Sequence, residues 1–233
     1  MEIIFRCCEM EASLSYVERW APKKEILRKC WLSLQDSVTQ EDNFVIMHDK
    51  VSKNTLDFLC KTARTKFQLI EIGEHSWEFN LHTVTLFDYL ENEIYNRPNE
   101  VFYIVEDDYL HTEDALHYLK ALYKDGWKTF ALSYDYPDRY KNLEPRYVLL
   151  MGGYHWATVS SSCTTFAVTG EALQGKPIEI FKKAAPQSDD RLYPEIFKEQ
   201  GCLAPIPGLS AHLTKHHLSP VINWKSRWEE IKI

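Results

Sequence analysis

Residues 101–110, VFYIVEDDYL, join a run of apolar side chains to three consecutive carboxylates. The apolar run has the composition of a buried β-strand, and Glu106, Asp107 and Asp108 follow it without a break. Three neighbouring anions repel one another unless a positive charge lies among them. Carboxylate oxygens are ligands that Mg²⁺ and Mn²⁺ prefer. The stretch therefore predicts a strand that ends at a site for a divalent cation.

The segments on either side of this stretch alternate between strand and helix. Apolar runs predict strands at 3–8, 43–49, 67–73, 100–107 and 128–136, and helical spacing predicts helices at 23–35, 53–63, 80–96 and 113–126. The strands are continuous apolar runs, which are typical of a parallel sheet buried on both faces. We expect an α/β, Rossmann-like fold with a mostly parallel central sheet flanked by helices. In such sheets ligands bind at the carboxyl ends of the strands.

The second half of the chain has a different pattern. Residues 147–170 read as strands joined by turns, and 170–184 as partly helical. A helix is expected from near Ser188 to Gly201, followed by strand and loop over 202–224. No internal repeat or low-complexity linker divides the sequence. We therefore expect a single domain over residues 1–233.

The composition favours some classes of protein over others. The net charge of −7 disfavours nucleic-acid binding, which depends on clustered Lys and Arg. The six cysteines include no CxxC pair, so a zinc ribbon is not expected. The charged N-terminus is unlike a signal peptide, and no apolar run is long enough to span a membrane. These features predict a cytoplasmic protein without a membrane span.

The E-D-D sequence at the end of a fourth buried strand resembles the DxD motif of GT-A glycosyltransferases, and its variant form resembles that of the Golgi N-acetylglucosaminyltransferases. The resemblance implies a GT-A-like fold with a nucleotide-sugar-binding half at 1–136 and an acceptor and catalytic half at 137–233. It also implies a nucleotide-sugar donor, with a UDP-sugar expected, and Mn²⁺ or Mg²⁺ as the cofactor. The other substrate would be a carbohydrate or glycan acceptor.

The resemblance also assigns roles in the first half. Arg6 and Asp49, at the ends of the first two strands, would contact the nucleotide. Glu106 and Asp107 would lie near the ribose and the sugar, and Asp108 would bind the metal. Ordinary roles remain open, because Arg6 can form an ion pair and Asp49 can begin a turn.

Two adjacent acids lie well downstream, where the resemblance implies the catalytic base of an inverting enzyme. Asp190 is the first choice and Asp189 the second. Either carboxylate would take the proton from the acceptor hydroxyl as it attacks the anomeric carbon. Helix capping explains the same cluster, with Ser188 as the N-cap and both acids in the first turn.

Three histidines in the last part of the sequence could complete the metal site. In many GT-A enzymes a late histidine contacts the metal or the phosphates. His212 lies nearest the expected strand end, and His217 is the alternative ligand. A surface loop rich in histidine is the competing interpretation.

Other functions share parts of this pattern. Response-regulator receiver domains carry a similar acidic stretch with Mg²⁺, but after their first strand, so a receiver-like signalling module is disfavoured. A nucleotidyltransferase would show a Gly-rich basic loop where this chain has FRCCEMEAS. A glycosyltransferase acting on DNA bases or another polymer would keep the chemistry and change the acceptor.

Overall fold

The computed structural model describes residues 1–9, 20–72, 81–141, 145–187, 190–214, 216–219 and 221–233. Its strands are β1 (Glu2–Cys8), β2 (Asn43–Asp49), β3 (Phe67–Glu71), β4 (Val101–Glu106), β5 (Tyr109–His111), β6 (Phe130–Ala131), β7 (Val148–Met151), β8 (Tyr154–Thr158), β9 (Phe166–Thr169), β10 (Cys202–Ile206) and β11 (Ser210–His212). Its α-helices are α1 (Lys23–Asp36), α2 (Lys53–Thr62), α3 (Leu81–Ile94), α4 (Ala115–Lys124), α5 (Asp138–Lys141), α6 (Gly170–Leu173), α7 (Lys176–Ala184), α8 (Tyr193–Gln200) and α9 (Trp224–Glu230).

The main sheet has the strand order β3-β2-β1-β4-β9-β6-β10-β8-β7. The first four strands in this order are mutually parallel, and β9 runs antiparallel to β4. The apolar residues of β1 and β4 are buried on both faces of the sheet, as their continuous hydrophobic sequences require. This confirms the α/β fold class with a mostly parallel central sheet flanked by helices.

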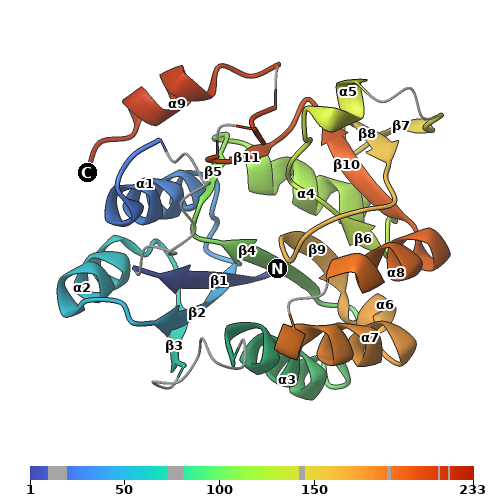
Figure 1. The fold of residues 1–233 in the computed structure, drawn as a ribbon, viewed down its shortest axis with the longest axis horizontal. Coiled ribbons are helices and arrows are strands. Elements are labelled where there is room, and N and C mark those ends of the chain that lie inside the picture. The colour runs from blue at the N-terminus through green and yellow to red at the C-terminus, as the bar shows by residue number, and fades with distance from the viewer. Residues whose placement is uncertain (10–19, 73–80, 142–144, 188–189, 215, 220) are drawn as a thin grey trace.

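The helices cover both faces of the sheet (Figure 1). Helices α1 and α4 lie on one face, and α3, α6 and α7 lie on the other. The face under α3 and α7 is packed with aromatic rings, and Phe181 of α7 stacks on both Phe87 and Phe166. Sheet and helices share one large core, so strands from both halves of the chain are parts of one body.

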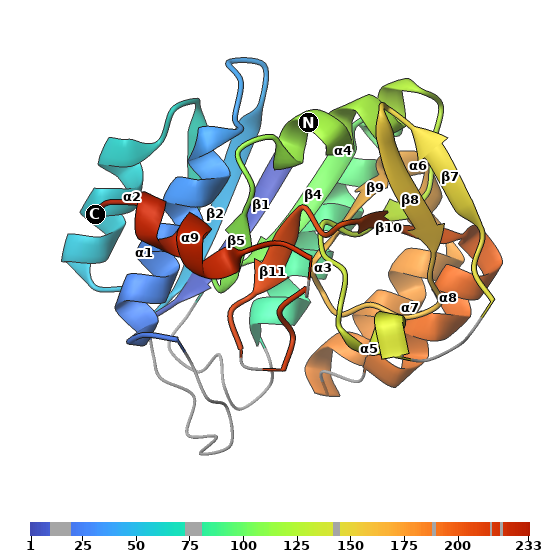
Figure 2. The same cartoon turned by 90° about the horizontal axis from the view of Figure 1, so that it is seen from above.

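A two-stranded ribbon of β5 and β11 lies outside the main sheet (Figure 2). It pairs Ser210 with His111 and His212 with Tyr109. A second, smaller apolar cluster joins this ribbon to the outer side of α1 and to α9. The C-terminal part of the chain is thereby fixed beside the end of β4, although about a hundred residues separate the two in sequence.

Two expectations about elements were wrong. The strand expected at 128–136 is only two residues long, because the chain then leaves the sheet and Tyr134 bridges to Ser210 of the ribbon. The helix expected from near Ser188 begins at Tyr193, where Pro194 occupies the first turn. The sequence also gave no expectation of β5 or of α9, whose start is capped by the Asn223 side chain.

The position of the acidic stretch excludes one alternative. The acidic stretch follows β4, which is the fourth strand in sequence. A receiver-like signalling module would carry such a stretch after its first strand, so this alternative is excluded. Within the described residues, none of the helices is both long and apolar enough to cross a bilayer. The cytoplasmic location and the division of the chain at residue 136 stay predictions.

Candidate active site

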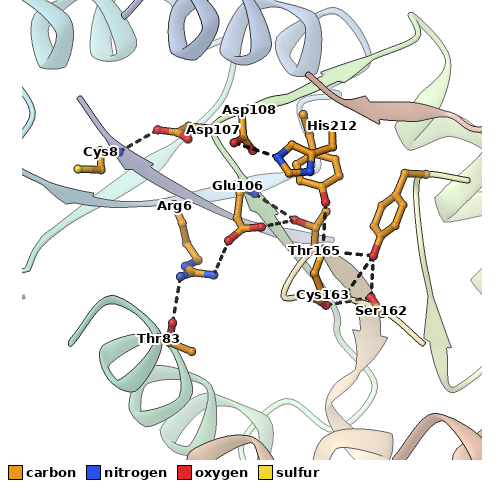
Figure 3. Close-up of polar contacts among 12 residues, drawn as sticks. Arg6, Cys8, Thr83, Glu106, Asp107, Asp108, Ser162, Cys163, Thr165 and His212 are labelled. Atoms are coloured by element: carbon orange, nitrogen blue, oxygen red, sulfur yellow. Dashed lines mark hydrogen bonds and ion pairs between the residues drawn. The ribbon is translucent and has the colours of Figure 1, made fainter. Parts of the chain in front are cut away.

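The carboxyl ends of β1, β2 and β4 meet at one edge of the sheet, because these strands are adjacent and parallel. This edge carries the side chains that the sequence singled out in the first half, namely Arg6, Asp49, Glu106, Asp107 and Asp108. Figure 3 shows Arg6 turned toward Glu106, and Asp108 turned toward His212. The three acids point to three different partners, which explains how they can be adjacent without facing one another.

Glu106 is the last residue of β4 and lies opposite Arg6 in the strand register. Arg6 Nη1 is 3.4 Å from Glu106 Oε1, and Arg6 Nη2 donates to Thr83 Oγ1 of α3 at 3.2 Å. The hydroxyl of Thr165 donates to the other Glu106 oxygen at 3.3 Å. The Glu106 side chain is nevertheless 33% exposed. It is therefore an oriented carboxylate that a ligand can reach.

Asp107 points into the protein. Its side chain is only 7% exposed, forms an ion pair with Lys23 at the start of α1, and accepts a hydrogen bond from the backbone N–H of Cys8 at 2.8 Å. Burial raises the pKa of Asp107, and the Lys23 charge opposes that rise. Through these two contacts Asp107 holds α1 and β1 against the end of β4.

Asp108 lies in the turn between β4 and β5. Its Oδ2 is 3.2 Å from Nε2 of His212, the last residue of β11. The pairing of β5 with β11 brings the two side chains together, because it places His212 opposite Tyr109. The Tyr109 ring also stacks on the His212 imidazole, with centroids 5.0 Å apart. His212 is thus held on the carboxylate by both backbone register and ring stacking.

His217 contacts the His212 side of the Asp108–His212 pair. Its ring stacks on that of His212 with centroids 5.2 Å apart, and its Nδ1 is within hydrogen-bond distance of Thr214 Oγ1. Burial lowers the pKa of His212, but the Asp108 carboxylate outweighs burial, so the pKa lies above its usual value. Burial and the neighbouring His212 lower the pKa of His217. The two histidines therefore have opposite tendencies to bind a proton.

Asp49 ends β2 and is 1% exposed. Its Oδ2 is 3.4 Å from Nε2 of His82, in the first turn of α3. Burial and then the positive charge of Arg6 lower the pKa of His82 to about 4, so this imidazole is neutral at pH 7. Cys8 of β1 lies opposite Asp49 in the strand register. The expected contact of Asp49 with a nucleotide stays a prediction.

The two candidates for the base have no described side chain. Asp189 lies outside the described residues, and for Asp190 only the backbone is described, in a short 3₁₀ turn over Asp190–Leu192. This turn precedes α8. The assignment of a base therefore stays a prediction.

Sequence reasoning missed several side chains that orient these acids. Lys23, Thr83 and Thr165 contact Asp107, Arg6 and Glu106 across 59 to 84 positions of sequence. No local spacing relates such distant partners. One local feature could have indicated the partner of Asp107. Lys23 is the first residue of α1, where a positive side chain is unfavourable unless an anion lies beside it.

The Asp108–His212 pair has the ligand chemistry of a divalent-metal site. A carboxylate oxygen and an imidazole nitrogen 3.2 Å apart match the separation of about 3 Å between adjacent ligands of an octahedral ion with bonds of about 2.1 Å. Imidazole is a softer ligand than Mg²⁺ prefers. The pair therefore fits Mn²⁺ better than Mg²⁺.

Known proteins resemble this chain in fold and not in sequence. No family model matches it, and no curated protein matches it in sequence. The crystal structure of S. aureus TarS 1–349 matches with a TM-score of 0.52 at 12% identity, over 87% of this chain and 56% of that one. TarS 1–349 in complex with UDP-GlcNAc gives 0.45 at 12% identity, over 80% and 53%. The galactosyltransferase LgtC with donor and acceptor sugar analogues gives 0.45 at 10% identity, over 86% and 71%.

Of these three, the first alone exceeds a TM-score of 0.5, and at such low identity it shows the fold alone. The chain spans about half the length of that TarS structure. The chain therefore has a GT-A-like α/β fold.

Proposed function

We propose that this protein is a metal-dependent glycosyltransferase that moves a sugar from a UDP-sugar to the hydroxyl of a carbohydrate acceptor. The observation that carries the proposal is the Asp108–His212 pair at the carboxyl end of β4, beside the solvent-facing carboxylate of Glu106. Ligands of α/β sheets bind at this edge. The TarS complex with UDP-GlcNAc supports a UDP-linked donor as the first choice.

Asp108 and His212 would hold the metal, with Mn²⁺ favoured. When bound, the ion would neutralise the diphosphate of the donor and stabilise it as a leaving group. Arg6 and Asp49 would contact the nucleotide at the ends of β1 and β2. Glu106 would face the ribose or the sugar. Asp107 would have an indirect role. Its side chain accepts a hydrogen bond from the backbone N–H of Cys8 and would thereby fix the turn in which Asp108 lies.

The carboxylate of Asp190, with Asp189 as the alternative, would act as the base. It would accept the proton of the acceptor hydroxyl while the hydroxyl oxygen forms a bond to the anomeric carbon. The bond between that carbon and the diphosphate oxygen would break, and UDP would leave. The configuration of the sugar would be inverted, because a single displacement occurs and no enzyme nucleophile takes part.

The metal role is tested with Asp108→Asn. The substitution keeps the shape of the side chain and removes its charge. We expect Mn²⁺-dependent hydrolysis of UDP-sugars to fall by about a hundredfold or more, since a few kcal/mol of electrostatic stabilisation is lost. Asp57→Asn, an exposed acid on α2, is the matched control. Undiminished hydrolysis by Asp108→Asn would show that Asp108 has no metal role.

The base is tested by comparing Asp190→Asn with Asp189→Asn. Loss of a general base lowers the rate of transfer by about 10²–10⁴-fold and leaves the affinity for the donor unchanged. Transfer is measured by release of UDP with a panel of sugar acceptors, and donor binding by calorimetry with UDP and Mn²⁺. If both variants transfer sugar at the wild-type rate, neither acid is the base.

A further inference from the structure

A second group of metal-ligand side chains lies beside the proposed reaction centre. It consists of the Cys8 thiol at the end of β1, the Asp49 carboxylate at the end of β2 and the His82 imidazole in the first turn of α3. We propose that these three side chains bind a soft divalent cation such as Zn²⁺, at a site separate from that of Asp108. The proposal does not depend on glycosyl transfer.

The geometry of the three side chains is close to that of a bound ion. One ligand atom from each lies within 4.8 Å of the other two, and His82 Nε2 is 3.4 Å from Asp49 Oδ2. Zinc bonds of about 2.0–2.3 Å in a tetrahedron place ligand atoms about 3.3–3.8 Å apart. To bind the ion, the ligand atoms would therefore move toward one another by about an ångström. Rotation of the side chains can supply this movement.

The backbone fixes two of the ligands relative to each other. Cys8 and Asp49 are direct partners in the parallel register of β1 and β2. Their strands carry some of the most buried residues of the core. Such a rigid support lowers the entropic cost of gathering ligands around a metal. His82 comes from α3, so a bound ion would also tie that helix to the sheet.

The charges near the group permit a cation. Arg6 and Lys23 are both close enough to lower the pKa of His82. Each is matched by an acid, since Arg6 pairs with Glu106 and Lys23 with Asp107. A Cys8 thiolate and the Asp49 carboxylate together supply two negative charges. They balance the charge of one divalent ion, and a neutral His82 offers its lone pair.

The chemistry of this group differs from that of the Asp108 site. A thiolate selects zinc and other soft ions, whereas carboxylate oxygens suit Mn²⁺ and Mg²⁺. Figure 3 shows Cys8 and the Asp108–His212 pair on opposite sides of Asp107. Asp49 would serve both the metal and the nucleotide, so the experiment uses the metal alone.

The experiment is a titration of the full chain with Co²⁺ and Zn²⁺ in the absence of nucleotide. We expect one thiolate-bound Co²⁺ per chain, with the near-ultraviolet absorption of a cobalt–thiolate bond, and displacement of that ion by Zn²⁺. Cys8→Ser should abolish that absorption, and His82→Ala should weaken binding by at least about tenfold. Cys60→Ser on α2 is the matched cysteine control and Asp108→Asn the matched metal-site control, and both should keep the absorption.

X-ray absorption of the zinc-loaded wild-type chain gives a second measurement that needs no variant. A sulfur scatterer at about 2.3 Å from zinc supports the proposal. A zinc shell of nitrogen and oxygen alone, or a cobalt–thiolate absorption that survives in Cys8→Ser, would overturn it. Loss of the absorption in Asp108→Asn would mean that Asp108 and Cys8 belong to the same metal site, and this result would also overturn the proposal.

Discussion

His212 illustrates how a single side chain depends on its surroundings. It contacts Asp108, stacks on Tyr109 and on His217, and ends a strand of the ribbon. Each contact restricts the imidazole to one orientation. A pre-oriented ligand loses less entropy when it binds a metal than a mobile one does. His216, one residue before His217, is exposed and lacks this arrangement.

We expect His212→Asn to weaken the affinity for Mn²⁺ by at least about tenfold, because loss even of a residue that only orients a metal ligand costs about ten- to a hundredfold. His216→Asn should leave the affinity unchanged. Calorimetric titration of both variants with Mn²⁺ and UDP provides the comparison. Equal affinities in the two variants would mean that the His212 imidazole does not bind the ion.

At the scale of elements, the ion pair of Lys23 with Asp107 joins the start of α1 to the end of β4. Both side chains are less than a tenth exposed. Removing one partner of such a pair leaves a buried charge without compensation. Two elements that carry the proposed site are therefore held together by an interaction whose loss should be visible in stability.

Lys23→Met should lower the free energy of unfolding by about 3–5 kcal/mol, measured by urea denaturation. The double variant Lys23→Met with Asp107→Asn should recover at least about half of that loss, because no buried charge remains and the amide oxygen still accepts from Cys8. The neighbouring Lys24 is half-exposed, and its replacement by Met should cost less than about 1 kcal/mol. Equal effects of the two single substitutions would argue against the buried pair.

At the scale of the whole molecule, buried neutral histidines make stability depend on pH. His111 lies in the ribbon, where its Nε2 is 2.8 Å from the hydroxyl of Tyr103, and it is fully buried. Burial lowers the pKa of His111 to about 3, and the charge of Arg227 acts in the same direction. Protonation would therefore place an uncompensated charge between the ribbon and the sheet.

Acid should destabilise the protein through His111. The unfolded chain binds this proton below about pH 6.5 and the folded chain does not, so stability is complete above that pH and falls below it. The expected loss is about 2 kcal/mol between pH 8 and pH 5 for this residue alone. Urea denaturation at several pH values should give a shallower dependence for His111→Gln than for the wild type, and identical slopes would contradict the assignment.

Local sequence patterns were sufficient to predict the elements with a strong periodicity. Continuous apolar runs predicted β1 to β4, and helical spacing predicted α1 to α4, within two residues at most ends. The acidic stretch after the fourth strand, and His212 near a strand end, also followed from local order. These features depend on interactions between near neighbours in sequence, and such interactions leave a periodic trace.

The partners of these residues could be identified from the three-dimensional structure and not from local sequence. The antiparallel insertion of β9 between β4 and β6, and the ribbon that carries His212 to Asp108, depend on contacts between segments far apart in the chain. Lys23 became the partner of Asp107, and Cys8 became the neighbour of Asp49, through packing and strand register. Backbone hydrogen bonds and burial select such pairs without any fixed spacing in the sequence, so no local pattern could have revealed them.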